Sequence, residues 1–157
     1  MNLSEETIIL MMTKLCIDFG SGYNPKAGYK TCDVTTFPQL DFQYDGKDEI
    51  VGLREKSVDV FYLRNVVHHI PDLQRTFTTL KKYLKVGGKL VIIDCNKGHY
   101  KTNVFLDNLW YRFVGNNNEI FISKQYRDYI NVLKKLGFKQ LYYKSFKEKE
   151  ITKYECN

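Results

Sequence analysis

The strongest constraint on the fold is a strand, a helix and a second strand that follow one another directly. Residues 58–63 and 89–93 are short apolar runs, and the second is almost continuously apolar, as in a strand that is covered on both faces. Between them, Pro71 and Asp72 supply helix-start signals. The apolar face of this helix repeats at spacings of four, three and four: Leu73, Phe77, Leu80 and Leu84. The Gly87–Gly88 pair is predicted to end the helix.

The same alternation extends in both directions along the chain. Three shorter strands are predicted earlier, each ending at an aspartate: 15–17 at Asp18, 29–32 at Asp33, and about 40–44 at Asp45. A second helix is predicted after Ser123, followed by a strand at 138–146 and a returning antiparallel strand at 151–156. Strand–helix alternation with buried strands indicates an α/β fold with a mostly parallel sheet.

Length and composition fit one folded domain, residues 1–157. The chain has 157 residues, of which 43% are hydrophobic and 27% charged, and neither a linker nor a repeat divides it. The apolar run at residues 8–12 is too short to span a membrane and lacks the basic flank of a signal peptide. The four cysteines are widely separated and form no C-x-x-C pair. We therefore expect a cytoplasmic protein with free thiols, no metal site and no membrane association.

The net charge of +6 is unevenly distributed. Residues 1–100 are almost neutral, at +1, whereas residues 101–157 carry +5. Such a basic third can bind a phosphate-rich partner such as a nucleic acid, or it can simply be a solvated lysine surface. Because the lysines alternate along predicted strands and helices, we expect the solvated surface, with only weak association with nucleic acids.

The three strand-end aspartates form the most informative group of residues. Ligands of parallel α/β sheets bind outside the carboxyl ends of the strands, which is where Asp18, Asp33 and Asp45 are predicted to lie. Any one of them can simply cap a turn. Together they favour a ligand rich in hydroxyl and amino donors.

The loop after the first strand restricts that ligand further. Gly20 and Gly22 permit a tight turn and a close approach of the backbone to a ligand. The dinucleotide fingerprint requires a third small residue that opens a helix, and Pro25 occupies that position. Too few residues remain before Asp33 for a crossover helix. NAD, FAD and nucleoside triphosphates are thus disfavoured, and a nucleoside without phosphates fits better.

These segments together resemble the class I S-adenosylmethionine-dependent methyltransferases, and in particular the methyltransferase type 11 group. The resemblance is carried by residues 18–22, Asp33, Asp45, residues 57–72 and residues 84–93. It implies a Rossmann-like, doubly wound, mostly parallel sheet of seven strands with an antiparallel final strand. This chain departs from the family in a shortened first crossover and in reduced N-terminal helices.

The resemblance also implies a cofactor, S-adenosylmethionine, and a set of residues that bind it. The glycine loop, Gly20 to Gly22 with Ser21 between them, would wrap the methionine part. Asp18 would face its ammonium group and Asp33 the ribose hydroxyls. The other cofactor-binding residues are predicted around the adenine and the methionine: Asp45 and Gly46 for the adenine, and Asn65 beside the methionine.

Two further groups are predicted to act on the methyl acceptor. His68 and His69 follow the fourth strand, close to where the methyl group would lie, and a histidine can exchange a proton near neutral pH. Alternatively, the two histidines have no catalytic role and only shape the turn before the helix. Residues 97–122 are predicted to form a substrate-side insertion, in which Tyr100 and Trp110 would contact the acceptor.

The sequence therefore predicts a methyltransferase that acts on an unidentified acceptor, with a small molecule favoured. Motifs for amino-methylation of bases (N/D-P-P-Y/F) and for cytosine C5 chemistry (P-C) are both absent. Two alternatives remain open at this point. One is a catalytically inactive relative that serves as a binding or assembly protein, and the other is a basic nucleic-acid-binding domain without a cofactor.

Overall fold

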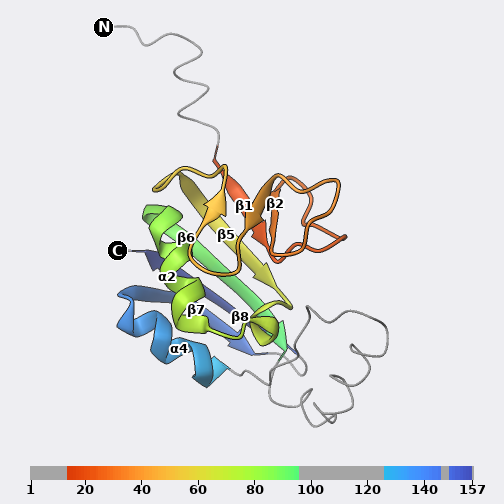
Figure 1. Ribbon diagram of the computed structural model, residues 1–157. Coiled ribbons are helices and arrows are strands. Elements are labelled where there is room, and N and C mark those ends of the chain that lie inside the picture. Colours follow the sequence, from red (N-terminus) through yellow and green to blue (C-terminus); the bar gives the residue numbers. More distant parts are fainter. Residues whose placement is uncertain (1–13, 96–125, 146–148, 157) are drawn as a thin grey trace, which may run out of the picture.

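The computed structural model describes residues 14–95, 126–145 and 149–156. These residues form one eight-stranded sheet with the strand order β4-β3-β2-β1-β5-β6-β8-β7 (Figure 1). The strands are β1 (Cys16–Phe19), β2 (Lys30–Asp33), β3 (Phe42–Tyr44), β4 (Ile50–Val51), β5 (Val58–Arg64), β6 (Leu84–Cys95), β7 (Phe138–Ser145) and β8 (Lys149–Cys156). The helices are α2 (Leu73–Tyr83), α4 (Tyr126–Lys135) and the short 3-10 helix η1 (Val67–His69).

The strand directions confirm the predicted fold class. Strands β1, β2, β3, β5 and β6 are parallel to one another. Strand β8 is antiparallel to both of its neighbours, β6 and β7, so β7 runs with the parallel set. The sheet has one strand more than the seven predicted. The additional strand β4 is antiparallel to β3 and only two residues long, too short for a recognisable period.

Helix α2 ends earlier than predicted. It begins as expected, because Oδ1 of Asp72 accepts a hydrogen bond from the backbone N–H of Arg75 at 2.9 Å. It ends at Tyr83, and Leu84 already pairs with Val58 as the first residue of β6. The Gly87–Gly88 pair lies inside that strand, where it serves close packing. A Cβ on Gly88 would lie 3.1 Å from the carbonyl oxygen of Val58.

The core lies between the sheet and the two helices, which lie side by side on the same face (Figure 1). Helix α2 contributes Phe77 and Leu80, helix α4 contributes Leu133, and the sheet contributes Phe61 and Leu90, all with 0% of their surface exposed. Burial alternates along β5, where Phe61 and Leu63 are buried and the residues between and beside them are only half-buried. The two faces of the sheet are therefore not equivalent.

The first crossover is shortened as predicted. Residues 20–29 connect β1 to β2 without a helix. Backbone contacts hold this loop instead: the N–H of Gly20 donates to the carbonyl of Cys32 at 2.8 Å, and Nη2 of Arg64 donates to the carbonyl of Asn24 at 2.6 Å. The methionine side of the predicted cofactor site is thus built from a loop alone.

Several predictions for the rest of the chain concern residues outside the described ranges. They include the N-terminal segment, residues 97–122 with Tyr100 and Trp110, and Ser123. Among the described residues, no helix is long and apolar enough to cross a membrane, and no group of three or more His, Cys, Asp and Glu side chains is placed to hold a metal ion. Three of the cysteines, Cys16, Cys32 and Cys156, are free thiols.

Candidate cofactor and acceptor site

A cavity of about 370 Å³ lies at the carboxyl ends of β1, β2, β3 and β5, where the sequence predicts a ligand. The lining comes from the ends of these four strands, the turns that follow them and the start of α2. Its residues are Phe19, Gly20 and Gly22 at the end of β1, Asp33, Val34 and Thr35 at the end of β2, Tyr44 and Gly46 at the end of β3, and Asn65, Val66, His69, Ile70, Pro71, Asp72, Arg75 and Thr76 after β5. Six predicted site residues therefore meet here: Gly20, Gly22, Asp33, Gly46, Asn65 and His69. Four others lie outside the lining: Asp18, Ser21, Asp45 and His68.

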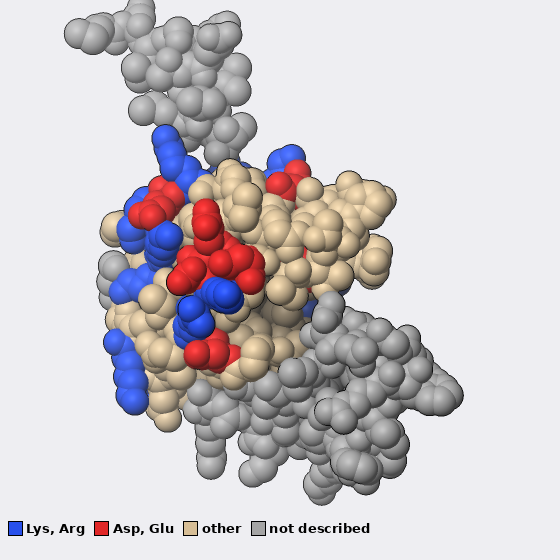
Figure 2. Space-filling model, viewed as in Figure 1, with Lys and Arg blue, Asp and Glu red and all other residues tan. Residues whose placement is uncertain are grey.

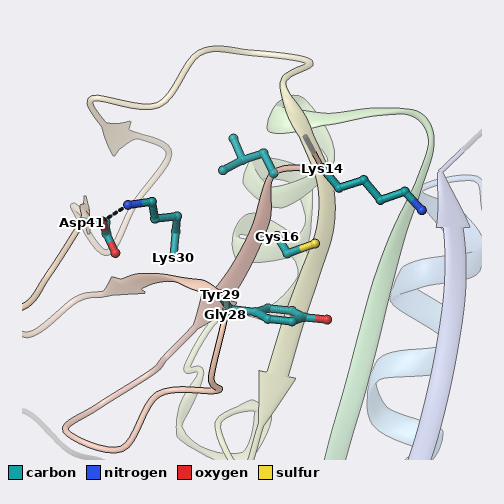
Figure 3. Close-up of a pocket in the computed structure, with 7 residues that line it drawn as sticks. Lys14, Cys16, Gly28, Tyr29, Lys30 and Asp41 are labelled. Carbon is teal, nitrogen blue, oxygen red and sulfur yellow. Dashed lines mark hydrogen bonds and ion pairs between the residues drawn. The ribbon is translucent and has the colours of Figure 1, made fainter. Parts of the chain in front are cut away.

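A second hollow, of about 520 Å³, lies near the opposite end of β1 and β2 (Figure 3). It is lined by residues of both strands, and one of its cations, Lys30, is paired with Asp41 at 2.8 Å. Although this hollow is larger, it lacks the convergent polar groups of the first. We therefore place the functional site at the carboxyl ends of the strands.

The backbone conformation and the neighbours of Gly20 both require a glycine at this position. Its φ angle is +72°, a left-handed conformation that glycine adopts without strain. A Cβ on this residue would lie 2.2 Å from Cγ2 of Val66, so the β1–β2 loop can approach the β5–α2 turn only because no side chain is present. Gly22 also has a positive φ, +54°, but the space around its Cα is open. The two glycines thus have different roles.

Asp33 has the geometry that the ribose assignment needs. Its Oδ2 accepts the N–H of Gly22 and its Oδ1 accepts the N–H of Thr35, each at 2.9 Å. Each oxygen of an ionised carboxylate can accept two hydrogen bonds, so one position on each remains for a hydroxyl of a ligand. The same contacts fix the carboxylate in one orientation at the cavity wall.

Asp18 lies inside β1 rather than at its end, because Phe19 continues the strand. The side chain is 2% exposed, and its Oδ2 accepts the backbone N–H of Lys26 at 2.7 Å, which holds the short crossover loop. Burial raises the pKa of the Asp18 carboxyl, and the N–H of Lys26 and the charge of Arg64 oppose this only in part. The structure thus gives Asp18 a role in shaping the loop.

Ser21 carries a buried hydroxyl with no hydrogen-bond partner among the described residues. The residue is 7% exposed, and its Oγ lies between the two glycines of the loop. Buried hydroxyls are nearly always hydrogen-bonded. Because Ser21 is not among the residues that line the cavity, its hydroxyl does not face a ligand there.

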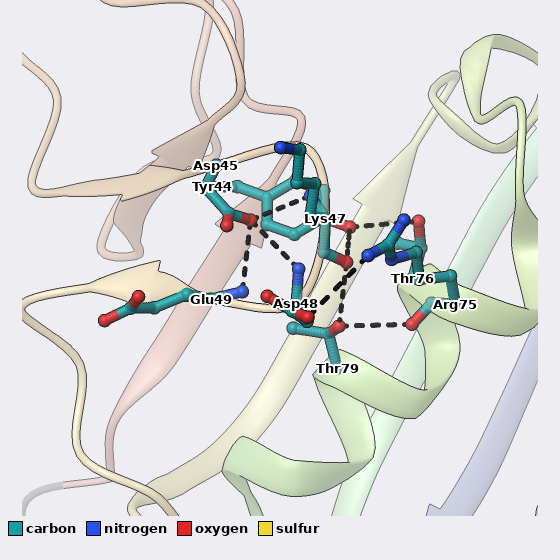
Figure 4. Close-up of polar contacts among 8 residues, drawn as sticks. All are labelled: Tyr44, Asp45, Lys47, Asp48, Glu49, Arg75, Thr76 and Thr79. Carbon is teal, nitrogen blue, oxygen red and sulfur yellow. Dashed lines mark hydrogen bonds and ion pairs between the residues drawn. The ribbon is translucent and has the colours of Figure 1, made fainter.

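Asp45 organises the turn between β3 and β4 (Figure 4). Its Oδ1 accepts the backbone N–H groups of Lys47, Asp48 and Glu49 at 2.8, 3.0 and 3.1 Å. The turn also contacts α2, because the hydroxyls of Tyr44 and Thr79 both donate to the carbonyl oxygen of Lys47. Asp45 thus shapes the turn that brings Gly46 to the cavity, but Asp45 itself does not line the cavity as the sequence predicted.

The contacts of Asp45 predict a pH-dependent stability. Slight desolvation acts to raise the pKa of Asp45, but the N–H groups of Glu49, Lys47 and Asp48 outweigh it and hold the pKa below the ordinary value of 3.8. A carboxyl whose pKa is lowered by folding stabilises the protein above its unfolded pKa, and this contribution is lost as the pH falls through the folded value. Asp45→Asn should therefore be less stable than the native protein at pH 6, and the difference should shrink as the pH falls below the ordinary pKa of 3.8. Urea unfolding at pH 6 and at a series of lower pH values measures it, and a difference that is independent of pH would contradict this account.

The histidine pair divides into a buried and a cavity-lining member. His68 is 6% exposed, and its Nδ1 lies 2.6 Å from Oδ1 of Asp94, which is itself 2% exposed. The other oxygen of Asp94 accepts the N–H of Val67 at 2.8 Å and so fixes the η1 turn. His69 lines the cavity, and its ring centre lies 4.1 Å from that of His68. A carboxylate, a buried imidazole and a cavity-lining imidazole thus follow one another from β6 to the cavity.

Asn65 connects these elements at the end of β5. It has φ = +53°, an uncommon conformation for a residue other than glycine, and its N–H donates to the carbonyl of Ile93 at 2.8 Å. Strained backbone of this kind is often found at functional sites. The bend turns the chain from the sheet into the cavity wall.

Asp94 was not predicted as a site residue from the sequence, although it also follows a predicted apolar strand. Asp94 comes at the end of the apolar run 89–93, as the other strand-end aspartates follow theirs. Its partner His68 is 26 positions away, so only the pairing of β5 with β6 shows the contact.

Comparisons with known proteins agree with this fold. A family model described as a methyltransferase domain matches residues 16–92. A solved S-adenosylmethionine-dependent methyltransferase from Mesorhizobium loti superposes with a TM-score of 0.66 at 13% identity, covering 96% of each chain. The geranyl diphosphate C-methyltransferase of Streptomyces coelicolor, solved with S-adenosyl-L-homocysteine, gives 0.65 at 11% identity over 92% of this chain and 74% of that one.

Two curated relatives extend the likeness to sequence. The ubiquinone/menaquinone biosynthesis C-methyltransferase of Campylobacter jejuni is 25% identical over 144 residues, which are 80% of this chain and 60% of that protein. The lovastatin diketide synthase of Aspergillus terreus is 37% identical over 65 residues, which are 41% of this chain and 3% of the synthase. This chain therefore spans less than two thirds of either relative. The matched residues and the shared fold agree with the predicted resemblance to the class I methyltransferases of the type 11 group.

Proposed function

We infer that this protein transfers the methyl group of S-adenosylmethionine to a small organic acceptor. The observation that carries the proposal is the cavity at the strand ends, where the oriented carboxylate of Asp33 faces the same space as the Gly20 loop and His69. The match of residues 16–92 to a methyltransferase domain model supports the reaction type.

Each part of the cavity has a proposed role towards the cofactor. Asp33 accepts the ribose hydroxyls with the two positions that its backbone contacts leave. The loop of Gly20, Ser21 and Gly22 surrounds the methionine part, with Asn65 opposite it. The adenine lies between Gly46 and the start of α2, on the turn that Asp45 holds in place. When bound, the sulfonium of the cofactor supplies the electrophilic methyl group.

His69, which lines the cavity, is proposed to accept a proton from the acceptor. The buried His68–Asp94 pair lies directly behind His69 and is proposed to position it. A base is needed when the acceptor is a carbon or a hydroxyl that must lose a proton. Since two of the similar proteins are named C-methyltransferases, a carbon acceptor is favoured.

The experiment that tests the cofactor site is the substitution Asp33→Ala. Losing hydrogen bonds to a charged group costs about 1.5–3 kcal/mol, so affinity for S-adenosylhomocysteine should fall by roughly tenfold or more. Isothermal titration calorimetry measures it. The matched control is Asp41→Ala, which removes a carboxylate that lies outside the cavity. Unchanged affinity in a folded Asp33→Ala protein would remove Asp33 from the site.

Turnover distinguishes an enzyme from an inactive binding protein. With the cofactor bound, production of S-adenosylhomocysteine is measured over a panel of small acceptors with acidic C–H or O–H groups. Acceptor-dependent product supports the proposal, whereas binding without product across the panel favours the inactive alternative.

A further inference from the structure

The sheet presents a second face on which the described residues place no helix. Both described helices, α2 and α4, lie on the opposite face and contact each other (Figure 1). Parallel strands are ordinarily covered on both faces. Here the strands of the open face carry half-buried side chains where their neighbours on the helix face are fully buried.

The register of the strands shows which side chains share this open face. Directly paired residues project to the same side of a sheet. One row runs across β7, β8, β6 and β5 through Tyr142, Lys153, Val91 and Tyr62. A second row runs through Lys139, Glu155, Lys89 and Val60, and a third through Lys144, Ile151, Ile93 and Arg64.

The open face is strongly basic. Its cations come from four strands and from the crossover loop: Lys26, Arg64, Lys89, Lys139, Lys144 and Lys153. The only acidic side chains in the same rows are Glu155, which is paired with Lys89 at 2.8 Å, and Asp18, which is 2% exposed. On the helix face, by contrast, acidic and basic side chains lie intermingled (Figure 2). From the sequence, the alternation of lysines along strands predicts a scattered, solvated surface. In the structure, the same alternation along β7 and β8 places the lysines on one face of the sheet.

Aromatic rings lie among these cations. Nζ of Lys26 is 4.9 Å from the ring centre of Tyr62 and 5.2 Å from that of Tyr29, and the two rings are 5.7 Å apart. At the other side of the face, Tyr142 is 47% exposed beside Lys153. The hollow of 520 Å³ adjoins Tyr29 and Cys16 at the margin of this face (Figure 3).

We propose that this open face binds single-stranded nucleic acid. A sheet that presents aromatic rings for base stacking among lysines for phosphates is the chemistry by which proteins hold single strands without reading the sequence. A second copy of this chain is a poor partner for the face, because it would place cations against cations. The face is separate from the cofactor cavity, and none of its rows includes a residue that lines that cavity.

Fluorescence anisotropy with a labelled 12-nucleotide oligouridine tests the proposal on the full chain. If about four phosphates are contacted, the logarithm of the affinity should fall with the logarithm of salt with a slope of about −3. Between about 50 and 200 mM salt, the affinity should then fall roughly 50-fold. Lys139→Gln combined with Lys153→Gln should bring the slope to about −1.4. Tyr142→Ala should weaken binding at least about fivefold with the slope unchanged.

The matched control is Lys134→Gln combined with Lys135→Gln, an equal change of charge on exposed positions of α4. It should leave the slope near its native value. Equal losses in the two double variants, binding that does not depend on salt, or no binding of the oligonucleotide would each overturn the proposal. Binding to phosphatidylglycerol vesicles without binding to oligouridine would overturn it in favour of a lipid surface. Calorimetry with S-adenosylhomocysteine on the same variants, expected unchanged, keeps this outcome separate from that of the methyltransferase proposal.

Discussion

Gly20→Ala is expected to lower the free energy of unfolding by about 2–5 kcal/mol and to remove measurable binding of S-adenosylhomocysteine. A residue with a side chain at φ = +72° costs about 1–2 kcal/mol. The new Cβ would also overlap Cγ2 of Val66 at 2.2 Å, and overpacking of this kind typically adds about 1–3 kcal/mol. Because Gly20 and Val66 both line the cavity, separating them also deforms the cofactor site.

Two variants make this prediction specific. Gly22→Ala has a similar φ but open space around its Cα, so it should lose only about 1 kcal/mol and stay folded. Gly20→Ala combined with Val66→Ala should recover only part of the overpacking, because Cβ of residue 66 would remain 2.8 Å from the new Cβ, and it should keep the conformational part. Urea unfolding measures all three proteins. If Gly20→Ala and Gly22→Ala proved equally stable, the close approach to Val66 would have no energetic weight.

His69→Gln is expected to lower kcat by a factor of roughly 10²–10⁴ while affinity for S-adenosylhomocysteine changes less than about twofold. The reason is that His69 is proposed to take the proton at the cavity wall. His68→Gln and Asp94→Asn should lower kcat less, since these buried residues position His69 from behind and do not line the cavity.

Cofactor affinity is the control that separates chemistry from structure in these variants. Asp94 also accepts the N–H of Val67, so a purely structural role would loosen the η1 turn and weaken cofactor binding together with turnover. A parallel loss of both quantities in Asp94→Asn would therefore assign Asp94 to the fold. Thermal melting of each variant identifies any that fail to fold.

Local pattern was sufficient for most of the fold. The apolar runs and the spacing from Leu73 to Leu84 predicted the parallel sheet and the main helix, because burial leaves its period in the sequence. The end of α2 was predicted wrongly, because Gly87 and Gly88 looked like a helix stop. In the structure they lie inside β6, where Gly88 packs against the backbone of Val58.

The candidate site was predicted less completely, for a physical reason. Asp33 and the glycine loop follow from their position after a strand. Whether an aspartate faces a ligand or a turn depends on one residue of register and on which N–H groups lie near it, as Asp18 and Asp45 show. The contact between His68 and Asp94 joins η1 to β6, 26 positions apart, and no local pattern records it.

The position of β8 has a consequence for how the chain folds. The last strand inserts between β6 and β7, and its Tyr154 pairs with Leu90, 64 positions earlier, and is 0% exposed. Contacts this distant in sequence form late, because the entropy of closing a long loop must be overcome first. During synthesis the edge of β6 therefore stays unpaired until residues 149–156 have left the ribosome. A chain truncated before Lys149 would keep that edge open and lose the attachment of β7, so it should aggregate rather than fold.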